Sequence, residues 1–238
     1  MTANSAAGWS LIVAVVVGLV GSLFTPGGLL IDPADSTSFG EAAGVLGDNA
    51  ELAQFMTFVF VISVVLYWFG LHSLNRAFSS GSLMDRVSRF ALNVFLIGYA
   101  LLIVELSFRH VLTHVLAHGV GVDSAEEKAM ATTLFAAAAG IHIAFLYVTS
   151  IGSTIFGYGL ARRSEGMSVF KLASVGLALT GLLSFVVLMI AEHVPAIDLH
   201  GVAVASNIVL FFGSICILVI GVGIMKGRQE FVGAEATA

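Results

Sequence analysis

The sequence predicts an all-α integral membrane protein that folds as a bundle of six transmembrane helices. Hydrophobic residues make up 58% of its 238 residues, charged residues make up only 11%, and the mean hydropathy is +1.01. A soluble globular domain carries about 25% charged residues, so this chain has too few charges to cover a water-facing surface. The composition therefore excludes a soluble enzyme, and a net charge of −5 without a basic patch excludes binding to nucleic acid.

Six apolar segments are the candidates for these helices. Most of them reach about 20 residues, the length with which an α-helix crosses the hydrocarbon core of a bilayer. No linker or internal repeat divides the chain, so we expect residues 1–238 to form a single transmembrane domain. The long connection 25–54 contains Gly, Pro and acidic residues and is expected to fold as a cap on the outer side. The predicted spans are residues 9–24, 55–71, 90–108, 141–161, 172–191 and 201–225.

The distribution of basic residues predicts how the bundle is oriented. Connections on the cytoplasmic side of a membrane protein carry an excess of Lys and Arg. Eight of the ten Lys and Arg residues lie on one side of the predicted bundle, the side that also carries both termini. We therefore expect both termini in the cytoplasm, and the protein in the cytoplasmic (inner) membrane of a prokaryote. The eight residues are Arg76, Arg86, Arg89, Arg162, Arg163, Lys171, Lys226 and Arg228.

The third and fourth helices have sequences that allow them to continue beyond the membrane. Helical spacing persists over residues 109–118, and Gly119 then ends the pattern. Residues 125–140, which precede the fourth apolar segment, also have a helical composition. The two helices can therefore extend on the outer face as a hairpin, closed by a turn over residues 119–124.

Six of the seven histidines fall on the predicted outer side. His110, His114 and His118 repeat every four residues, so they share an arc of about 80° on one helix face. Alignment of the spans by their charged ends brings histidines of four helices to one depth, where Glu192 and Asp198 could add carboxylate ligands. Neutral imidazole suits copper, zinc and iron, and facing helices can supply axial ligands to a haem. The candidate metal ligands are His110, His114, His118, His142, His193 and His200.

An acid and a base form a second candidate site in the third span. Glu105 lies inside the predicted hydrocarbon region, where an ionisable residue indicates a function by default. Arg109 follows four residues later, a spacing that favours an ion pair on one helix face. Glu105 can avoid the cost of burial by pairing with Arg109, by accepting a hydrogen bond from His142 or a hydroxyl of the fourth span, or by staying protonated. We expect the first, so that Glu105 faces the interior of the bundle as an intramembrane polar pair with Arg109.

Three functions are compatible with these patterns. The first is a redox or metal-handling membrane protein whose outer histidine and carboxylate site binds copper, zinc or a haem. The second is a proton-coupled transporter or channel that uses Glu105, Arg109 and the histidines. The third is a non-catalytic accessory or assembly subunit, with other membrane subunits or a second copy of the chain as partners in the bilayer. No residue pattern identifies a catalytic group, so whether the chain is an enzyme stays open.

Overall fold

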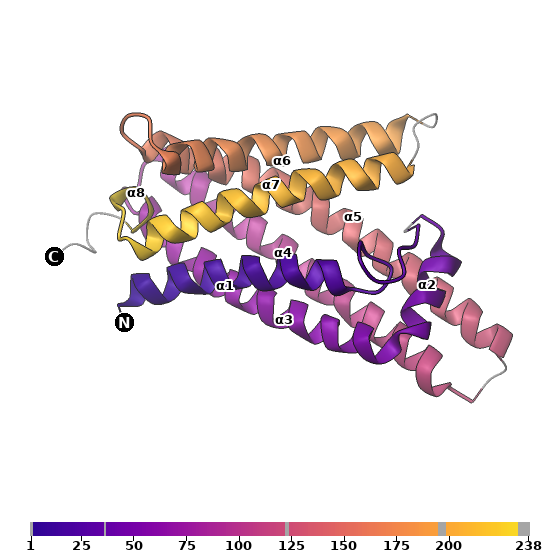
Figure 1. Cartoon of the computed structure of the whole chain (residues 1–238). Helices are drawn as coiled ribbons and strands as arrows, with labels where there is room; N and C mark the ends of the chain where they lie inside the picture. Colours follow the sequence, from indigo (N-terminus) through magenta and orange to yellow (C-terminus); the bar gives the residue numbers. More distant parts are fainter. Residues whose placement is uncertain (1, 36, 122–123, 195–198, 233–238) are drawn as a thin grey trace.

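The computed structural model describes residues 2–35, 37–121, 124–194 and 199–232, and within them the chain is helical and has no β-strand. Six helices are long and apolar enough to cross a membrane, which confirms an all-helical membrane protein. Two short α-helices and one 3-10 helix complete the described fold (Figure 1). The elements are α1 (Ala3–Phe24), α2 (Phe39–Asp48), α3 (Ala50–His72), η1 (Ser73–Phe78), α4 (Leu83–His118), α5 (Ser124–Arg163), α6 (Val169–His193), α7 (Leu199–Met225) and α8 (Gln229–Val232).

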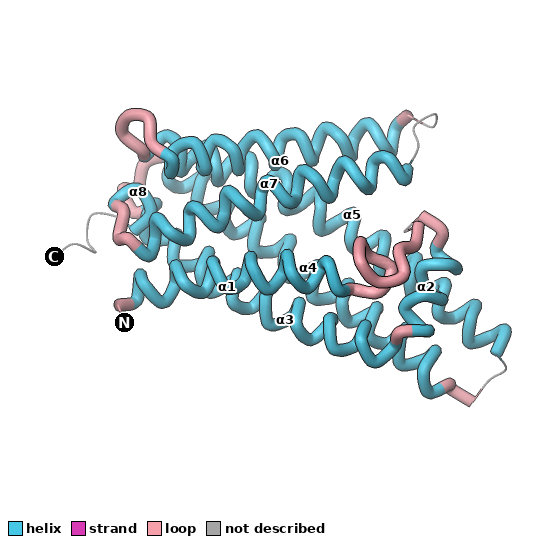
Figure 2. Tube along the Cα trace, in the orientation of Figure 1, coloured by secondary structure: helices cyan, strands magenta, loops and turns pink. Residues whose placement is uncertain are grey.

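The six long helices form a closed ring. Each helix packs against the next in the order α1, α3, α4, α5, α6 and α7, and α7 returns to α1. The two ends of the chain, together with η1 and α8, lie at one end of the bundle (Figure 1). The helix α2 lies at the opposite end, beside the connection that follows α1 (Figure 2). A ring of this kind gives each helix an inner face, on which polar side chains are shielded from lipid.

The helices are longer than the apolar segments because polar caps outside those segments start and end them. Ser82 begins α4 by accepting a hydrogen bond from the backbone N–H of Asp85 at 3.1 Å. Gly119 ends α4 with a φ of +68°, a left-handed conformation that favours glycine. Ser168 caps α6 in the same way as Ser82, by accepting from the N–H of Lys171 at 3.1 Å. Capping chemistry, rather than hydropathy, therefore sets these boundaries.

The α4–α5 hairpin is longer than the other helices. With 36 and 40 residues, α4 and α5 measure about 54 Å and 60 Å, against about 30 Å for the hydrocarbon core. At the end away from the termini, α2 packs on this hairpin through a small apolar cluster. The cluster is Ala42, Ala43, Leu46, Ala53, Leu112, Ala131 and Phe135. The connection after α1 thus folds back onto the hairpin instead of extending away from it.

Glycines set the closest helix contacts of the ring. A Cβ atom on Gly152 of α5 would lie 2.5 Å from the backbone N of Phe95 on α4. A Cβ on Gly8 of α1 would lie 2.6 Å from the carbonyl oxygen of Gly221 on α7. Small residues at helix contacts are the usual means by which membrane helices approach closely, since lipid supplies no hydrophobic drive between them.

We expect Gly152→Ala to destabilise the bundle by about 1–3 kcal/mol, because its Cβ would overlap backbone atoms of α4 and force the two helices apart. Gly140→Ala on the same helix is the matched control. No atom lies within 4 Å of the position that its Cβ would take, and replacing a helical glycine by alanine stabilises by about 0.5–1 kcal/mol. Thermal unfolding in detergent measures the stability of both variants. Equal stability of the two variants would contradict close α4–α5 contact at Gly152.

Candidate functional site

Two charged side chains are buried among the described residues, and both are carboxylates of α4. Asp85 is 6% exposed and Glu105 is 1% exposed. The 20 residues between them correspond to about 30 Å along a helix, which equals the thickness of the hydrocarbon core. The two carboxylates therefore lie at opposite ends of an apolar slab, and each must be paired to stay ionised there.

Glu105 is held by groups from two helices. Its Oε1 lies 2.8 Å from Nη2 of Arg109, the ion pair expected from the four-residue spacing. Its Oε2 lies 2.7 Å from Nδ1 of His142 on α5. Because an ionised carboxylate only accepts hydrogen bonds, Nδ1 is the ring nitrogen that carries the proton and donates. Both carboxylate oxygens of Glu105 are thus satisfied, and the side chain ties α4 to α5.

The partners of Glu105 are more exposed at the surface of the bundle than Glu105 itself. The side chains of Arg109 and His142 are 31% and 34% exposed, against 1% for Glu105. The cluster is electrically neutral when His142 is neutral, and it carries one positive charge when His142 is protonated. The buried carboxylate of Glu105 is therefore connected to the surface of the bundle through the partly exposed side chains of Arg109 and His142.

Asp85 is paired at the other end of the same two helices. Its Oδ2 accepts hydrogen bonds from the hydroxyl of Ser80 at 2.6 Å and from the backbone N–H of Ser80 at 3.0 Å. Its Oδ1 lies 3.4 Å from Nη1 of Arg163 on α5. Arg163 also lies over the ring of Phe78, with 5.9 Å between the guanidinium carbon and the ring centroid. Asp85 and Arg163 therefore form a second carboxylate–arginine pair. Unlike the first, it joins α4 to α5, at the end of the bundle that carries the termini.

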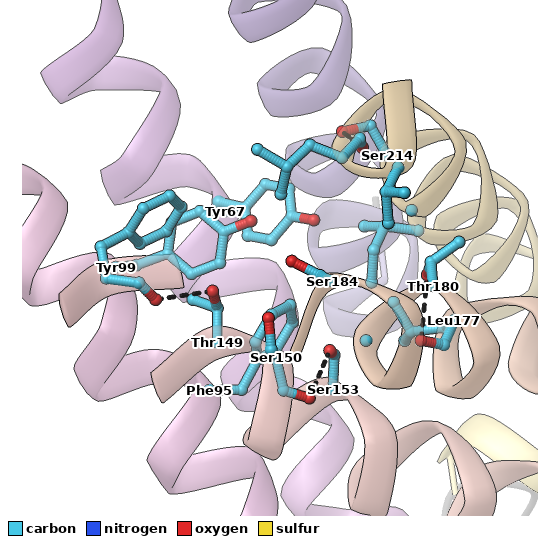
Figure 3. Close-up of a pocket in the computed structure, with 16 residues that line it drawn as sticks. Tyr67, Phe95, Tyr99, Thr149, Ser150, Ser153, Leu177, Thr180, Ser184 and Ser214 are labelled. Carbon is cyan, nitrogen blue, oxygen red and sulfur yellow. Dashed lines mark hydrogen bonds between the residues drawn. The ribbon is translucent and has the colours of Figure 1, made fainter. Parts of the chain in front are cut away.

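A cavity of about 50 Å³ lies inside the ring, between these two charged sites (Figure 3). It is lined by hydroxyl-bearing side chains from five helices, and none of the described residues that line it is charged. One hydroxyl from each of α3, α4, α5, α6 and α7 is supplied by Tyr67, Tyr99, Thr149, Thr180 and Ser214. The rest of the wall is apolar, and the hydroxyl groups make this space in the middle of a transmembrane bundle a candidate for part of a polar pathway.

Aromatic rings separate this cavity from the Glu105 cluster. The ring of Phe145 packs on His142 with 5.4 Å between centroids, and on Tyr99 with 5.7 Å. Tyr99 packs in turn on Tyr67, with 4.5 Å between centroids. Phe145, Tyr99 and Tyr67 all line the cavity. The charged cluster, the ring stack and the cavity therefore follow one another along the inside of the bundle.

The predicted metal ligands are distributed over separate surfaces. His110, His114 and His118 are exposed on α4, on a different face from the buried Glu105. The rings of His114 and His118 lie together, with 4.7 Å between centroids. His142 instead binds Glu105, and His193 is exposed with Nδ1 2.9 Å from the carbonyl oxygen of Met189.

No group of three His, Cys, Asp or Glu side chains that could hold a metal ion occurs in the part of the chain that the structure describes. The side chains of His200 and Glu192 and the whole of Asp198, which the sequence predicts at the same depth, lie outside the described residues. A site that includes them stays a prediction.

Several polar residues of the site are not evident from their sequence positions. Asp85 lies in a segment with the composition of a basic connection, and the cavity hydroxyls are single Ser, Thr and Tyr residues inside apolar spans. Helical spacing does place Thr149 and Ser153 on the face of α5 that carries His142. The same four-residue spacing of Thr180 and Ser184 is the signal that could have found the hydroxyl groups of α6.

Comparison of the chain with protein-family models, with curated proteins and with solved structures finds no match. The function has to be inferred from the geometry of the site.

We expect Arg109→Leu to destabilise the protein by about 3 kcal/mol, because it leaves the buried Glu105 with one partner in place of two. The double variant Glu105→Leu, Arg109→Leu removes both charges and should recover most of that loss. Arg86→Leu is the control, since Arg86 is an exposed arginine of the same helix. Thermal unfolding of the variants in detergent tests this. A single Arg109 variant as stable as the unchanged protein would mean that Glu105 does not depend on Arg109 for its charge.

Proposed function

We propose that this protein is a proton-coupled transporter or channel, and that Glu105 is the group that binds and releases the proton. The observation that carries the proposal is the almost complete burial of a carboxylate that is bonded to both Arg109 and His142. Buried acids in membrane helices are costly to keep ionised and mark proton and ion pathways. The hydroxyl-lined cavity further along the bundle supports the same function.

His142 is suited to deliver the proton to Glu105. Its ring is partly exposed, and its Nδ1–H already donates to Oε2 of Glu105 at 2.7 Å. When Nε2 takes a proton from water, the Nδ1 proton can pass to Oε2. The ring is then neutral again as the other tautomer, and Glu105 is a neutral carboxylic acid. The N–H bond that forms at Nε2 replaces the one that breaks at Nδ1. The new O–H bond of Glu105 replaces the O–H bond that breaks in the protonated water that supplied the proton, which is left as neutral water.

Protonation of Glu105 changes its contacts with Arg109 on α4 and with His142 on α5. The ion pair at 2.8 Å depends on the negative charge of Glu105, and it weakens when that charge is lost. The link to α5 also changes, because Oε2 now donates where it previously accepted. A proton therefore alters contacts on two helices at once, which is the kind of local change that biases a transporter between two states.

The distribution of basic residues supports an orientation in which Glu105 lies toward the outer side of the cytoplasmic membrane and Asp85 lies toward the cytoplasm. In this orientation the extended α4–α5 hairpin and the cap made by α2 belong to the outer face. A proton would then reach His142 from outside the cell.

The first experiment measures proton movement. We expect Glu105→Gln to abolish proton flux into liposomes that contain the purified protein and a pH-sensitive dye. Its melting temperature should stay close to that of the unchanged protein, because glutamine keeps the shape and can still accept from Arg109 or His142. Glu51→Gln, which changes an exposed carboxylate, is the matched control and should retain full flux. Full flux in Glu105→Gln liposomes would contradict the proposed role.

The second experiment determines the orientation. Single cysteines introduced at Ser80 and Glu165 should be labelled only from the cytoplasmic side, and one at Asp48 only from the outside. The native Cys216 is replaced by Ala beforehand, so that each variant has one thiol. Labelling of Asp48→Cys from the cytoplasm would invert the proposed direction of proton movement.

A second candidate function is a transition-metal or haem site on the exposed histidine face of α4. The observation that favours it is the contact between the rings of His114 and His118, whose four-residue spacing can bind one ion from a single helix. Copper, zinc and haem iron all accept imidazole. The redox or metal-handling function predicted from the sequence requires histidines of several helices to converge, and this face would supply the α4 ligands of such a site.

If the second candidate is right, the purified protein contains close to stoichiometric metal or a haem absorption band. The double variant His114→Ala, His118→Ala should lose it, while its melting temperature changes little because both side chains are exposed. His72→Ala, an exposed histidine at the other end of the bundle, is the control. Absence of metal and haem from the unchanged protein would eliminate this candidate. Absence of proton flux as well would leave an accessory or assembly subunit.

A further inference from the structure

Half of the eight hydroxyl groups that line the cavity have already donated their proton and present an acceptor oxygen. Four of its hydroxyl groups donate their proton to a carbonyl oxygen of their own helix: Thr149 to Phe145 at 2.7 Å, Ser153 to Ser150 at 3.2 Å, Thr180 to Leu177 at 3.1 Å, and Ser214 to Leu210 at 2.9 Å. A hydroxyl group has one proton and two lone pairs, so each of these oxygens can still accept. A molecule that donates hydrogen bonds can therefore bind to these four oxygens.

Ser184 on the cavity wall differs from these four hydroxyl groups. Its side chain comes from α6, is 3% exposed and points into the cavity (Figure 3). Its hydroxyl oxygen is buried and has no hydrogen-bond partner among the described residues. Leaving a buried polar group unbonded costs about 1–3 kcal/mol, and in a membrane no bulk water is at hand to reduce that cost. Ser184 therefore requires a partner inside the cavity.

The size and charge of the cavity select this partner. A volume of about 50 Å³ accommodates about three or four water molecules, at about 10–15 Å³ for each. A bare cation is disfavoured, because no carboxylate of the described residues lines the cavity to balance its charge. Water donates two hydrogen bonds and accepts two, so it satisfies both Ser184 and the acceptor oxygens of the wall.

We propose that the cavity holds a cluster of about three or four water molecules, and, resting on the proposed function, that this cluster is the mid-membrane step of the proton route. Thr149 and Ser153 lie seven and eleven residues after His142 on α5, or about 10 Å and 16 Å further along the helix. Arg163 follows His142 by 21 residues, or about 32 Å, so the water lies near the centre of the hydrocarbon, where a proton is most costly to carry.

Proton passage through such a cluster leaves its composition unchanged. Each water molecule that takes a proton on one side releases another on the far side, so one O–H bond forms for each that breaks. The rings of Phe145 and Tyr99 lie between His142 and the cavity. The ring of Phe145, which packs on both His142 and Tyr99, therefore lies on the direct path from the Glu105 cluster to the water.

The test measures hydration directly, with silver ions as the probe and Cys216→Ala as the background. A thiol reacts as its thiolate, which forms where water is present. Ser184→Cys should react with silver ions about tenfold or more faster than Leu183→Cys, its neighbour on the lipid-facing side of α6, which is 54% exposed. Equal rates for the two variants would mean that the cavity is dry, and would overturn the proposal.

A second pair of variants keeps the test valid if Ser184→Cys does not fold. Ser150→Cys lies on the cavity wall of α5, and Ile151→Cys is its lipid-facing neighbour, 43% exposed. The same difference in silver reactivity is expected. Fast reaction of the cavity cysteines together with unchanged flux in Glu105→Gln would remove the proposed function and leave the water cluster standing. Slow reaction of the cavity cysteines together with lost flux in Glu105→Gln would remove the water cluster and leave the proposed function standing.

Discussion

The burial of Glu105 is the constraint on which the rest of the arrangement depends. A carboxylate that is cut off from water has to keep its hydrogen-bond partners, and Glu105 takes one from its own helix and one from the next. The contact with His142 fixes the register of α4 against α5 at one end of the apolar slab. Asp85 and Arg163 fix it at the other end, about 30 Å away. Between these two anchors the helices are free to approach, and Gly152 against Phe95 lets them do so.

Close packing and the internal cavity have a common origin in small residues. Gly98 of α4 packs directly on Thr149, where an added Cβ would lie 2.3 Å from its Cγ2. Gly181 of α6 and Gly213 of α7 both line the cavity, so the helix walls there carry no side chain to fill it. The serines and threonines beside these glycines place hydroxyl groups in the same space. Segments whose composition predicts only tight transmembrane packing therefore also build a polar chamber.

The sequence predicts the spans and the Glu105–Arg109 pair because both are local properties. Hydropathy over 20 residues identifies a span, and a four-residue spacing brings two side chains to one face without help from another helix. The contact of His142 with Glu105 depends on how α5 is rotated against α4, and spacing along one helix does not determine that rotation. For the same reason, histidines that are predicted at the same depth in the membrane do not all lie together within the described residues. His110 is predicted at the depth of His142 but lies on an exposed face of α4.

Arg109 connects the buried carboxylate to the cap. Besides binding Glu105, it lines a small cavity of about 10 Å³ with Thr25, Leu46, Thr57 and Thr113, which belong to the end of α1, the cap helix, α3 and α4. Its Nε is buried and has no hydrogen-bond partner among the described residues. The hydroxyl of Thr57 donates to its own helix, so its lone pairs face outward as acceptors. In the proposed mechanism, loss of the charge on Glu105 frees the guanidinium to bind on this side. Arg109 therefore joins the buried carboxylate to residues of α1, α2 and α3, and in the proposed mechanism a proton on Glu105 changes the charge that these residues face.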